Sequence, residues 1–246
     1  MDITKQKNEY WLSREEQLIG GVALEVLRSS TVAVFGLGGV GGACCEALVR
    51  GGIGSLVIID NDNISSTNLN RQIFATVDTV GMPKTEAAAK RLLSINPNLN
   101  IVSHSSFFDE CTTEKIDFDK IDFICDCIDS TGSKVLLAKI AQEKNIKIIS
   151  SMGTGNKLNP SLFKVADISK TAYCPLARVM RKRLKDAGVR KLTVVYSEEE
   201  PVKNTSGVPA SIAFVPPAAG LIMAGHVINR LIENAIAEGT ASEDAE

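Results

Sequence analysis

The sequence is poor in the residues that most directly mark a metal site or a base-stacking surface. Among 246 residues there are only 2 His and 1 Trp, and aromatic residues make up 5% of the chain. His104 and His226 are isolated from any metal-like cluster, so we expect both to be packing or surface residues. The low aromatic content argues against extensive stacking on nucleic-acid bases.

An excess of charge of one sign is also absent. The chain has 27 Lys+Arg against 29 Asp+Glu, which leaves a net charge of −2. A protein that coats nucleic acid by bulk charge needs a strong basic excess. Any contact with nucleic acid must therefore be local.

Paired cysteines and long apolar runs are missing as well. The six cysteines include no Cys-x-x-Cys pair, which argues against a structural zinc site. Residues Met1–Lys7 lack the apolar core of a signal peptide, so we expect reduced thiols and a cytoplasmic protein. The apolar stretch Ala218–Ile232 carries Asn229 and Arg230 and is too short and polar for a membrane span, which predicts a buried helix.

What the sequence does contain is an alternation of short apolar runs with helical stretches. Hydrophobic residues make up 44% and charged residues 23%, as in ordinary globular proteins. Runs of continuous apolar character suit strands that are covered on both faces. We expect such strands at Val32–Phe35, Leu56–Asp60, Phe123–Asp126 and Ile146–Ser150.

Helices are expected between these strands and after them, at Arg14–Leu27, Gly39–Arg50, Lys84–Ser94, Ser133–Lys144, Leu176–Ala187 and Pro216–Ala237. The rhythm predicts an α/β fold with a Rossmann-like, doubly wound, mostly parallel sheet. Later strands near Phe163–Asp167 and Leu192–Tyr196 would add a mixed or antiparallel region. Because no linker is evident, we expect one domain over 1–246, with a core of about 12–237 and a polar tail at 238–246.

A glycine-rich turn directly follows the first expected strand. Gly36, Gly38, Gly39 and Gly41 fit Gly-x-Gly-x-x-Gly at a strand-to-helix junction. Glycines there permit a tight turn and close approach of a phosphate to the helix N-terminus. Asp60 follows Gly41 by 19 residues and ends the next expected strand, where a carboxylate accepts hydrogen bonds from ribose hydroxyls. The motif predicts a nucleotide but does not separate NAD from ATP.

Two cations after Asp60 favour ATP. A dehydrogenase needs little positive charge here, whereas attack of a carboxylate on a triphosphate brings two anions together. Arg71 offers a guanidinium fork and Lys84 a point charge for this purpose. Together with the glycine turn they predict an adenylate-forming site.

A third element is the acidic end of the strand Phe123–Asp126. Asp126 and Asp129 would lie at the carboxyl edge of the sheet, where doubly wound folds bind ligands. Mg²⁺ usually takes one or two carboxylates together with phosphate oxygens and water. We assign Asp129 to magnesium and expect the other carboxylate to cap the next helix.

In combination, these motifs resemble the ubiquitin-activating superfamily, which includes the adenylyltransferases of molybdopterin and thiamine biosynthesis. The resemblance rests on Gly-x-Gly-Gly-Val-Gly, Asp-x-Asp, Thr-Asn-x-Asn-Arg-Gln, Pro-Lys and Asp-x-x-Asp in this order. It implies ATP as cofactor, a magnesium ion, and a homodimer in which Arg14 reaches the neighbouring protomer's ATP. The implied nucleotide-binding residues are the four glycines with Asp60, Asp62, Asn68, Arg71, Gln72 and Lys84, and the implied catalytic residues are Arg14, Arg71, Lys84 and Asp129.

The second half narrows the resemblance to one branch. The segments Ser150–Pro160, Ala166–Thr171 and Cys174–Arg178 are similar to those of tRNA threonylcarbamoyladenosine dehydratases. In that branch the threonyl carboxylate of a modified adenosine is activated and closed into a ring with net loss of water. Adenylation gives the carboxylate a good leaving group, and intramolecular attack then has a large advantage in effective concentration.

The resemblance leaves the role of one thiol and the identity of the partners open. Thioester-forming relatives use a cysteine, so Cys174 is a candidate, although a buried thiol at a helix start is the commoner role. Sulfur-transfer partner proteins and a monovalent cation also remain candidates. We expect Leu176, Val179, Met180 and Leu184 to face the core of a helix whose cations contact tRNA, namely Arg178, Arg181, Lys182, Arg183 and Lys185.

Three other functions compete with the dehydratase. The nearest is an adenylyltransferase that activates the C-terminal glycine of a small sulfur-carrier protein. The others are an NAD-dependent dehydrogenase and a non-catalytic tRNA-binding protein.

Overall fold

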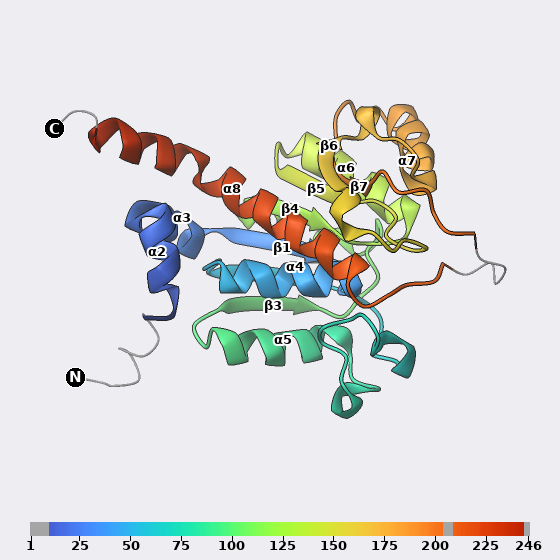
Figure 1. Cartoon of the computed structure of the whole chain (residues 1–246), viewed down its shortest axis with the longest axis horizontal. Helices are drawn as coiled ribbons and strands as arrows, with labels where there is room; N and C mark the ends of the chain where they lie inside the picture. Colours follow the sequence, from blue (N-terminus) through green and yellow to red (C-terminus); the bar gives the residue numbers. More distant parts are fainter. Residues whose placement is uncertain (1–9, 204–208, 244–246) are drawn as a thin grey trace.

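The computed structural model describes residues 10–203 and 209–243 of the chain (Figure 1). Within this part, seven strands form one sheet in the order β3-β2-β1-β4-β5-β7-β6. All neighbouring pairs are parallel except β6 with β7. The strands are β1 (Thr31–Phe35), β2 (Ser55–Ile59), β3 (Asn100–His104), β4 (Phe123–Asp126), β5 (Lys147–Ser151), β6 (Phe163–Asp167) and β7 (Thr193–Ser197).

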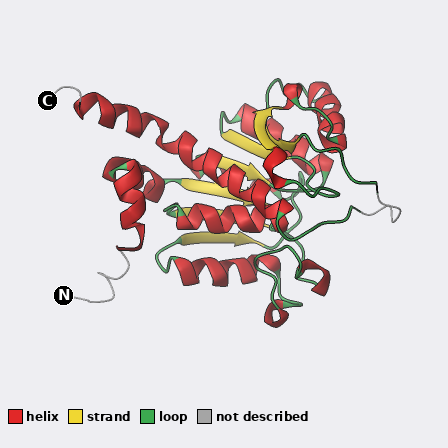
Figure 2. Ribbon diagram, viewed as in Figure 1, coloured by secondary structure: helices red, strands yellow, loops and turns green. Residues whose placement is uncertain are grey.

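Helices cover both faces of the sheet (Figure 2). One core contains side chains of α3 (Gly21–Ser29), α4 (Gly39–Arg50), α5 (Lys84–Ile95) and α8 (Val215–Glu243). The cores on the other face contain side chains of α6 (Thr131–Glu143) and α7 (Pro175–Asp186). α2 (Ser13–Ile19) precedes α3. Short 3-10 turns are η1 (Tyr10–Leu12), η2 (Ser66–Asn68), η3 (Val77–Thr79), η4 (Thr113–Lys115), η5 (Phe118–Lys120), η6 (Pro160–Leu162) and η7 (Ile168–Lys170).

Strand β1 explains why both faces must be covered. Successive side chains of a strand point to opposite faces. Val32 and Val34 belong to the core beneath α4 and α8, whereas Ala33 and Phe35 belong to the core beneath α6. All four side chains are fully buried. A continuous apolar run is therefore what this central strand requires.

Helix α8 crosses α4 at close range, and a glycine permits the crossing. A Cβ at Gly220 would overlap the carbonyl oxygen of Val40 and lie 2.9 Å from the amide nitrogen of Cys44. The stretch Val215–Glu233 has a mean hydropathy of 1.2 and, by length and composition alone, is able to span a membrane. In the fold it lies on α4 and the sheet, with Val215 and Met223 fully buried, which supports the predicted buried helix.

The predicted fold class is confirmed, and the differences are local. The expected helix Arg14–Leu27 is two helices, because Gly20 lies between them with φ 82°. Strand β3 was not expected, because this edge strand is mostly exposed and polar. The expected polar tail at 238–246 is helical as far as Glu243, and residues 244–246 lie outside the described part.

Candidate active site

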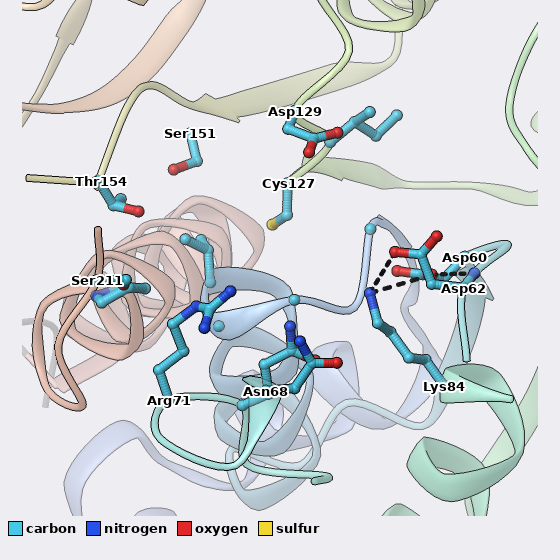
Figure 3. A pocket seen from close by; sticks show the side chains of 18 of the residues that line it. Asp60, Asp62, Asn68, Arg71, Lys84, Cys127, Asp129, Ser151, Thr154 and Ser211 are labelled. Atoms are coloured by element: carbon cyan, nitrogen blue, oxygen red, sulfur yellow. Dashed lines mark hydrogen bonds and ion pairs between the residues drawn. The ribbon is translucent and has the colours of Figure 1, made fainter. Parts of the chain in front are cut away.

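A cavity of about 660 Å³ lies at the carboxyl ends of the central strands (Figure 3). Its walls come from the turns that follow β1, β2, β3, β4 and β5. Strand order reverses between β1 and β4, which is where doubly wound folds bind ligands. The volume falls in the range of small-molecule sites.

The glycine turn forms one wall. Gly36 has φ 88°, and a Cβ there would lie 2.7 Å from the carbonyl oxygen of Cys127. A Cβ at Gly41 would overlap the carbonyl oxygen of Gly36. The absence of side chains lets β1, β4 and the start of α4 pack together. Gly36, Gly38 and Gly39 line the cavity beside the N-terminus of α4, where backbone N–H groups favour an anion.

Asp60 is held at the end of β2 by two backbone donors. The Leu37 N–H donates to its Oδ2 at 2.6 Å, and the Asp62 N–H donates to its Oδ1 at 2.8 Å. The first bond joins the carboxylate directly to the glycine turn. The side chain of Asp60 is 8% exposed and lines the cavity, which is the place that the sequence predicted for a ribose-binding carboxylate.

Lys84 lies beside this carboxylate. Its Nζ donates to Asp62 Oδ2 at 2.7 Å and lies 3.7 Å from Asp60 Oδ1 (Figure 3). The lysine side chain is 8% exposed, so the two carboxylates balance a largely buried charge. Lys84 was expected to face phosphates, and here it pairs with carboxylates at the cavity wall. Asp62 is thus a direct partner of Lys84.

Arg71, Asn68 and Gln72 line the neighbouring wall. The Arg71 guanidinium donates to the carbonyl oxygen of Thr67 at 3.0 Å and to Asn70 Oδ1 at 2.9 Å. The Asn68 Oδ1 accepts from the Ser65 N–H, so the amide caps η2 and leaves its NH₂ group for another partner. Figure 3 shows Arg71 and Asn68 reaching into the cavity from the same segment.

Asp129 faces this wall from across the cavity (Figure 3). It follows β4, is exposed, and makes no hydrogen bond or ion pair with the described residues. Both of its oxygens are therefore available. No group of three or more His, Cys, Asp or Glu side chains able to hold a metal exists in the described residues. A single free carboxylate in the cavity wall fits magnesium, which takes one or two carboxylates and completes its shell with phosphate oxygens and water.

Asp126 does not take the capping role that the sequence suggested. Helix α6 begins after Ser130 without any side-chain cap. Asp126 is fully buried instead, and its Oδ2 accepts from Lys134 Nζ at 3.1 Å and from Ser150 Oγ at 2.6 Å. The expectation was wrong because a lysine on α6 reaches back beneath β4.

Lys134 is the residue that sequence reasoning missed most completely. Its side chain is 0% exposed, and its Nζ also donates to Ser150 Oγ at 3.2 Å and to the carbonyl oxygen of Ser151 at 2.8 Å. The ammonium therefore ties β4, β5 and α6 together directly beneath the cavity, whose lining includes Ser151.

The loops after β5 and before α8 complete the cavity. Ser151, Gly153 and Thr154 line it on one side, and Ser211 lines it on another. Asn156 joins these loops, because its N–H donates to the carbonyl oxygen of Ala210 at 2.8 Å and its Oδ1 accepts from the Ala210 N–H at 2.7 Å. Other lining residues that the sequence did not indicate are Ser106, Phe107, Phe108, Ile128, Leu176, Pro209 and Pro216.

Two thiols lie at or near the cavity wall. The hydrogen bond with Cys44, together with burial, raises the pKa of the Cys127 thiol at the cavity wall. Cys174 precedes α7, is 4% exposed, and does not line the cavity. A Cβ at Gly153 would lie 3.7 Å from its Sγ, so Cys174 lies behind the cavity wall.

Two further predicted groups do not line the cavity. Arg14 is exposed on α2, next to the end of α4 that is remote from the glycine turn, and does not line the cavity of its own chain. On α7, Arg181 is turned inward and donates to the carbonyl oxygen of Thr171 at 3.0 Å. Val179 is 45% exposed, and Ala177 takes the core position expected for it.

Comparison with known proteins places this geometry in a family. The model of the ThiF family matches residues 12–243. The chain belongs to the ThiF family. A Bacillus subtilis (strain 168) relative, tRNA threonylcarbamoyladenosine dehydratase, is 39% identical over 240 residues, which cover 90% of this chain and 94% of the relative.

Solved structures of a second relative resemble this ThiF-family chain closely. The Escherichia coli enzyme TcdA, a tRNA N6-threonylcarbamoyladenosine dehydratase crystallised in complex with ATP, has a TM-score of 0.88 at 30% identity. The alignment covers 95% of this chain and 97% of that chain. The adenylyltransferase and sulfurtransferase UBA4 of Saccharomyces cerevisiae (strain YJM789) is 31% identical over 156 residues, which cover 63% of this chain but only 35% of UBA4.

Proposed function

We propose that this protein is an ATP-dependent tRNA threonylcarbamoyladenosine dehydratase. The observation that carries the proposal is the cavity itself, in which a glycine turn, Asp60, Arg71, Lys84 and Asp129 meet at the switch point of the sheet. Full-length similarity to the Bacillus subtilis dehydratase supports the tRNA substrate. The crystallised ATP complex of the Escherichia coli enzyme supports ATP as the nucleotide.

The proposed reaction has two steps, adenylation of the carboxylate and closure of the ring. An oxygen of the threonyl carboxylate attacks the α-phosphorus of ATP, and pyrophosphate leaves. A nucleophilic atom of the same modified side chain then attacks the carboxyl carbon, and AMP leaves as the ring closes. Overall, the modified nucleoside loses the atoms of one water molecule, and these atoms are carried away with AMP and pyrophosphate. Neither step requires a covalent enzyme intermediate, so neither requires Cys174.

The cavity residues supply charge and position. Backbone N–H groups at the start of α4 and the guanidinium of Arg71 would neutralise phosphate oxygens, so that an anionic carboxylate approaches. Asp60 would bind the ribose hydroxyls, because the Leu37 N–H fixes its carboxylate beside the turn. The ammonium group of Lys84 would contact the β- or γ-phosphate as well as the two carboxylates. The side-chain NH₂ groups of Asn68 and Gln72 would donate hydrogen bonds.

Asp129 would hold magnesium. When bound, the ion neutralises pyrophosphate oxygens and so helps pyrophosphate to leave. The free carboxylate of Asp129 is the feature of the cavity that fits this role. A monovalent cation remains a proposal without a residue assigned to it.

A second copy of the chain would complete the site. Arg14 does not line the cavity of its own chain, so its proposed contact with ATP requires a homodimer in which α2 of one protomer reaches the cavity of the other. Cytoplasmic location and sulfur-transfer partner proteins remain proposals that rest on the sequence.

The test is AMP formation that depends on the modified tRNA. Wild-type protein with ATP and magnesium should release AMP and pyrophosphate only when the tRNA carries threonylcarbamoyladenosine. Arg71→Ala and Asp129→Ala should abolish this release while the melting temperature stays near that of the wild type, because both side chains face solvent in the cavity. Release with unmodified tRNA, or full activity in both variants, would refute the proposal.

The alternative of a sulfur-carrier adenylyltransferase has a distinct readout. It predicts ATP–pyrophosphate exchange that requires a small carrier protein and ignores tRNA. UBA4 supports it less well than the dehydratases support the first proposal, since the match covers 35% of UBA4.

A further inference from the structure

Helix α7 carries a stripe of cations without partners. Arg178, Lys182 and Lys185 follow one another at i, i+4 and i+7, so they lie on one side of the helix. All three are exposed, and within residues 10–203 and 209–243 none of them makes an ion pair or hydrogen bond. The helix Pro175–Asp186 contains one acidic residue, Asp186. Asp186 stands at i+4 to Lys182 without forming an ion pair with it, and neither Arg178 nor Lys185 has a Glu or Asp at i±3 or i±4.

The core of the fold fixes the direction of this stripe. Ala177, Met180 and Leu184 are buried on the opposite side of α7, against α6 and β7. Arg181 lies between the two sides and is held by hydrogen bonds to Thr171. Because the buried side cannot rotate outward, the stripe has a fixed orientation relative to the cavity.

Helix α7 begins at the cavity wall. Leu176, in the first turn of α7, lines the cavity, whereas Arg178, two residues later, points to the other side of the helix. At 1.5 Å per residue, Arg178 and Lys185 are about 10 Å apart along the helix axis. A polyanion whose reactive group enters the cavity would therefore reach the three cations by following α7 from its N-terminal end.

An exposed aromatic side chain lies just before α7. Tyr173 is 62% exposed, and its φ is 57°, a left-handed conformation that is rare for residues other than glycine. The Cys174 N–H donates to the carbonyl oxygen of Ala172 at 2.7 Å and closes a tight turn beneath it. The backbone thus holds a phenol ring out of the core, directly before the stripe. Such local strain is typical of functional positions.

We infer that the α7 surface, formed by Tyr173, Arg178, Lys182 and Lys185, is the docking surface for the tRNA strand next to the modified nucleotide. The cations contact phosphates, and the Tyr173 ring stacks on a base that neighbours the one in the cavity. The inference rests on the proposed function, because that function brings the RNA to the cavity. With a net charge of −2 on the chain, binding depends on this local surface.

The first test compares two double variants that remove the same charge. R178Q/K182Q removes two cations from the stripe. The control K90Q/K120Q removes Lys90 from α5 and Lys120 from η5, both exposed and away from the cavity. Binding of threonylcarbamoyladenosine-modified tRNA is measured as a function of salt. We expect R178Q/K182Q to reduce the salt slope by about two and the affinity roughly 30-fold near physiological salt, because each lost phosphate contact removes about one unit of slope.

The second test separates stacking from charge. Y173G removes the ring and suits the positive φ, whereas Y173F keeps the ring. Y173G should weaken tRNA binding on the order of tenfold without changing the salt slope, because stacking involves no counterion release. Y173F should bind like the wild type.

AMP release by the wild type tests the proposed function, whereas tRNA binding by the variants tests the docking surface on α7. If wild-type protein releases AMP with modified tRNA, but R178Q/K182Q matches K90Q/K120Q in affinity and slope, the docking surface is wrong and the function stands. If wild-type protein releases no AMP with modified tRNA, the proposed function fails first. Melting temperatures of R178Q/K182Q and K90Q/K120Q within a few degrees of each other exclude misfolding as the cause of a difference.

Discussion

Replacement of Lys134 by Met should destabilise the protein strongly, because Met keeps the length of the side chain and removes its charge. In the wild type the ammonium and the Asp126 carboxylate are both 0% exposed, 3.1 Å apart. Without Lys134, Asp126 keeps only Ser150 Oγ and the Ile128 N–H as partners, and the carbonyl oxygen of Ser151 loses its donor.

The expected cost follows from the burial of the pair. Removal of one partner of a buried ion pair costs about 3–5 kcal/mol, because the remaining charge has neither a counterion nor water. In a domain of this size 1 kcal/mol lowers the melting temperature by about 2–4 °C, so K134M should melt about 6–20 °C below the wild type. Lys139 lies on the same helix and is exposed, so K139M should change the stability by less than about 0.5 kcal/mol.

A double-mutant cycle by urea unfolding isolates the pair. D126N should cost a similar amount to K134M, because it leaves the lysine buried without a counterion. D126N/K134M should lose less than the sum of the single losses by about 1–3 kcal/mol. If K134M unfolds like K139M, or if the losses of D126N and K134M simply add, the ion pair does not hold β4, β5 and α6 together.

Three further predictions concern other parts of the molecule. G220A should lower the free energy of unfolding by about 1–3 kcal/mol, because the added methyl group meets the backbone of α4. G225A lies on the same helix with open space around it, so it should be neutral or slightly stabilising. Thermal unfolding of both variants checks this. Burial, together with the charge of Arg230, lowers the pKa of His226, so the unfolded state binds the proton more readily and the stability should fall as the pH drops below about 6.5. Urea titrations between neutral pH and about pH 5.5 should show a smaller fall for H226Q, and an identical fall would contradict the assignment to this histidine. C174A should retain most of the tRNA-dependent release of AMP, since the thiol lies behind the cavity wall; complete loss with an unchanged melting temperature would make Cys174 a participant.

The sequence was sufficient to predict the central part of the fold and of the cavity. Alternating apolar strands and helices follow a simple topological rule that brings the carboxyl ends of parallel strands to one edge. Because Gly36, Asp60 and Asp129 each follow such a strand, they line one cavity as expected. The phosphate-binding roles of Arg71 and Lys84 stay predictions, although both line the same cavity.

Long-range contacts explain what the sequence did not reveal. Strand β3 is an exposed edge, so it lacks the continuous apolar run of the central strands, and the cavity residue Phe107 that follows it was not expected. Ser211 lies at the cavity because residues distant in the sequence hold its loop, among them Asn70, which donates to its carbonyl oxygen from 141 residues away. Lys134 has the local sequence of a surface lysine, and its burial becomes evident only when α6 lies over Asp126. None of these depends on a local pattern.

The proposed function is tested most directly by the mass of the modified nucleoside. Purified protein is incubated with ATP, magnesium and tRNA that carries threonylcarbamoyladenosine, and the nucleosides are then released under mild conditions and analysed by mass spectrometry. The proposed function predicts that this nucleoside loses the mass of one water molecule, with one AMP formed per nucleoside converted and no change when ATP is omitted. An unchanged nucleoside mass with fully folded, ATP-binding protein would contradict it.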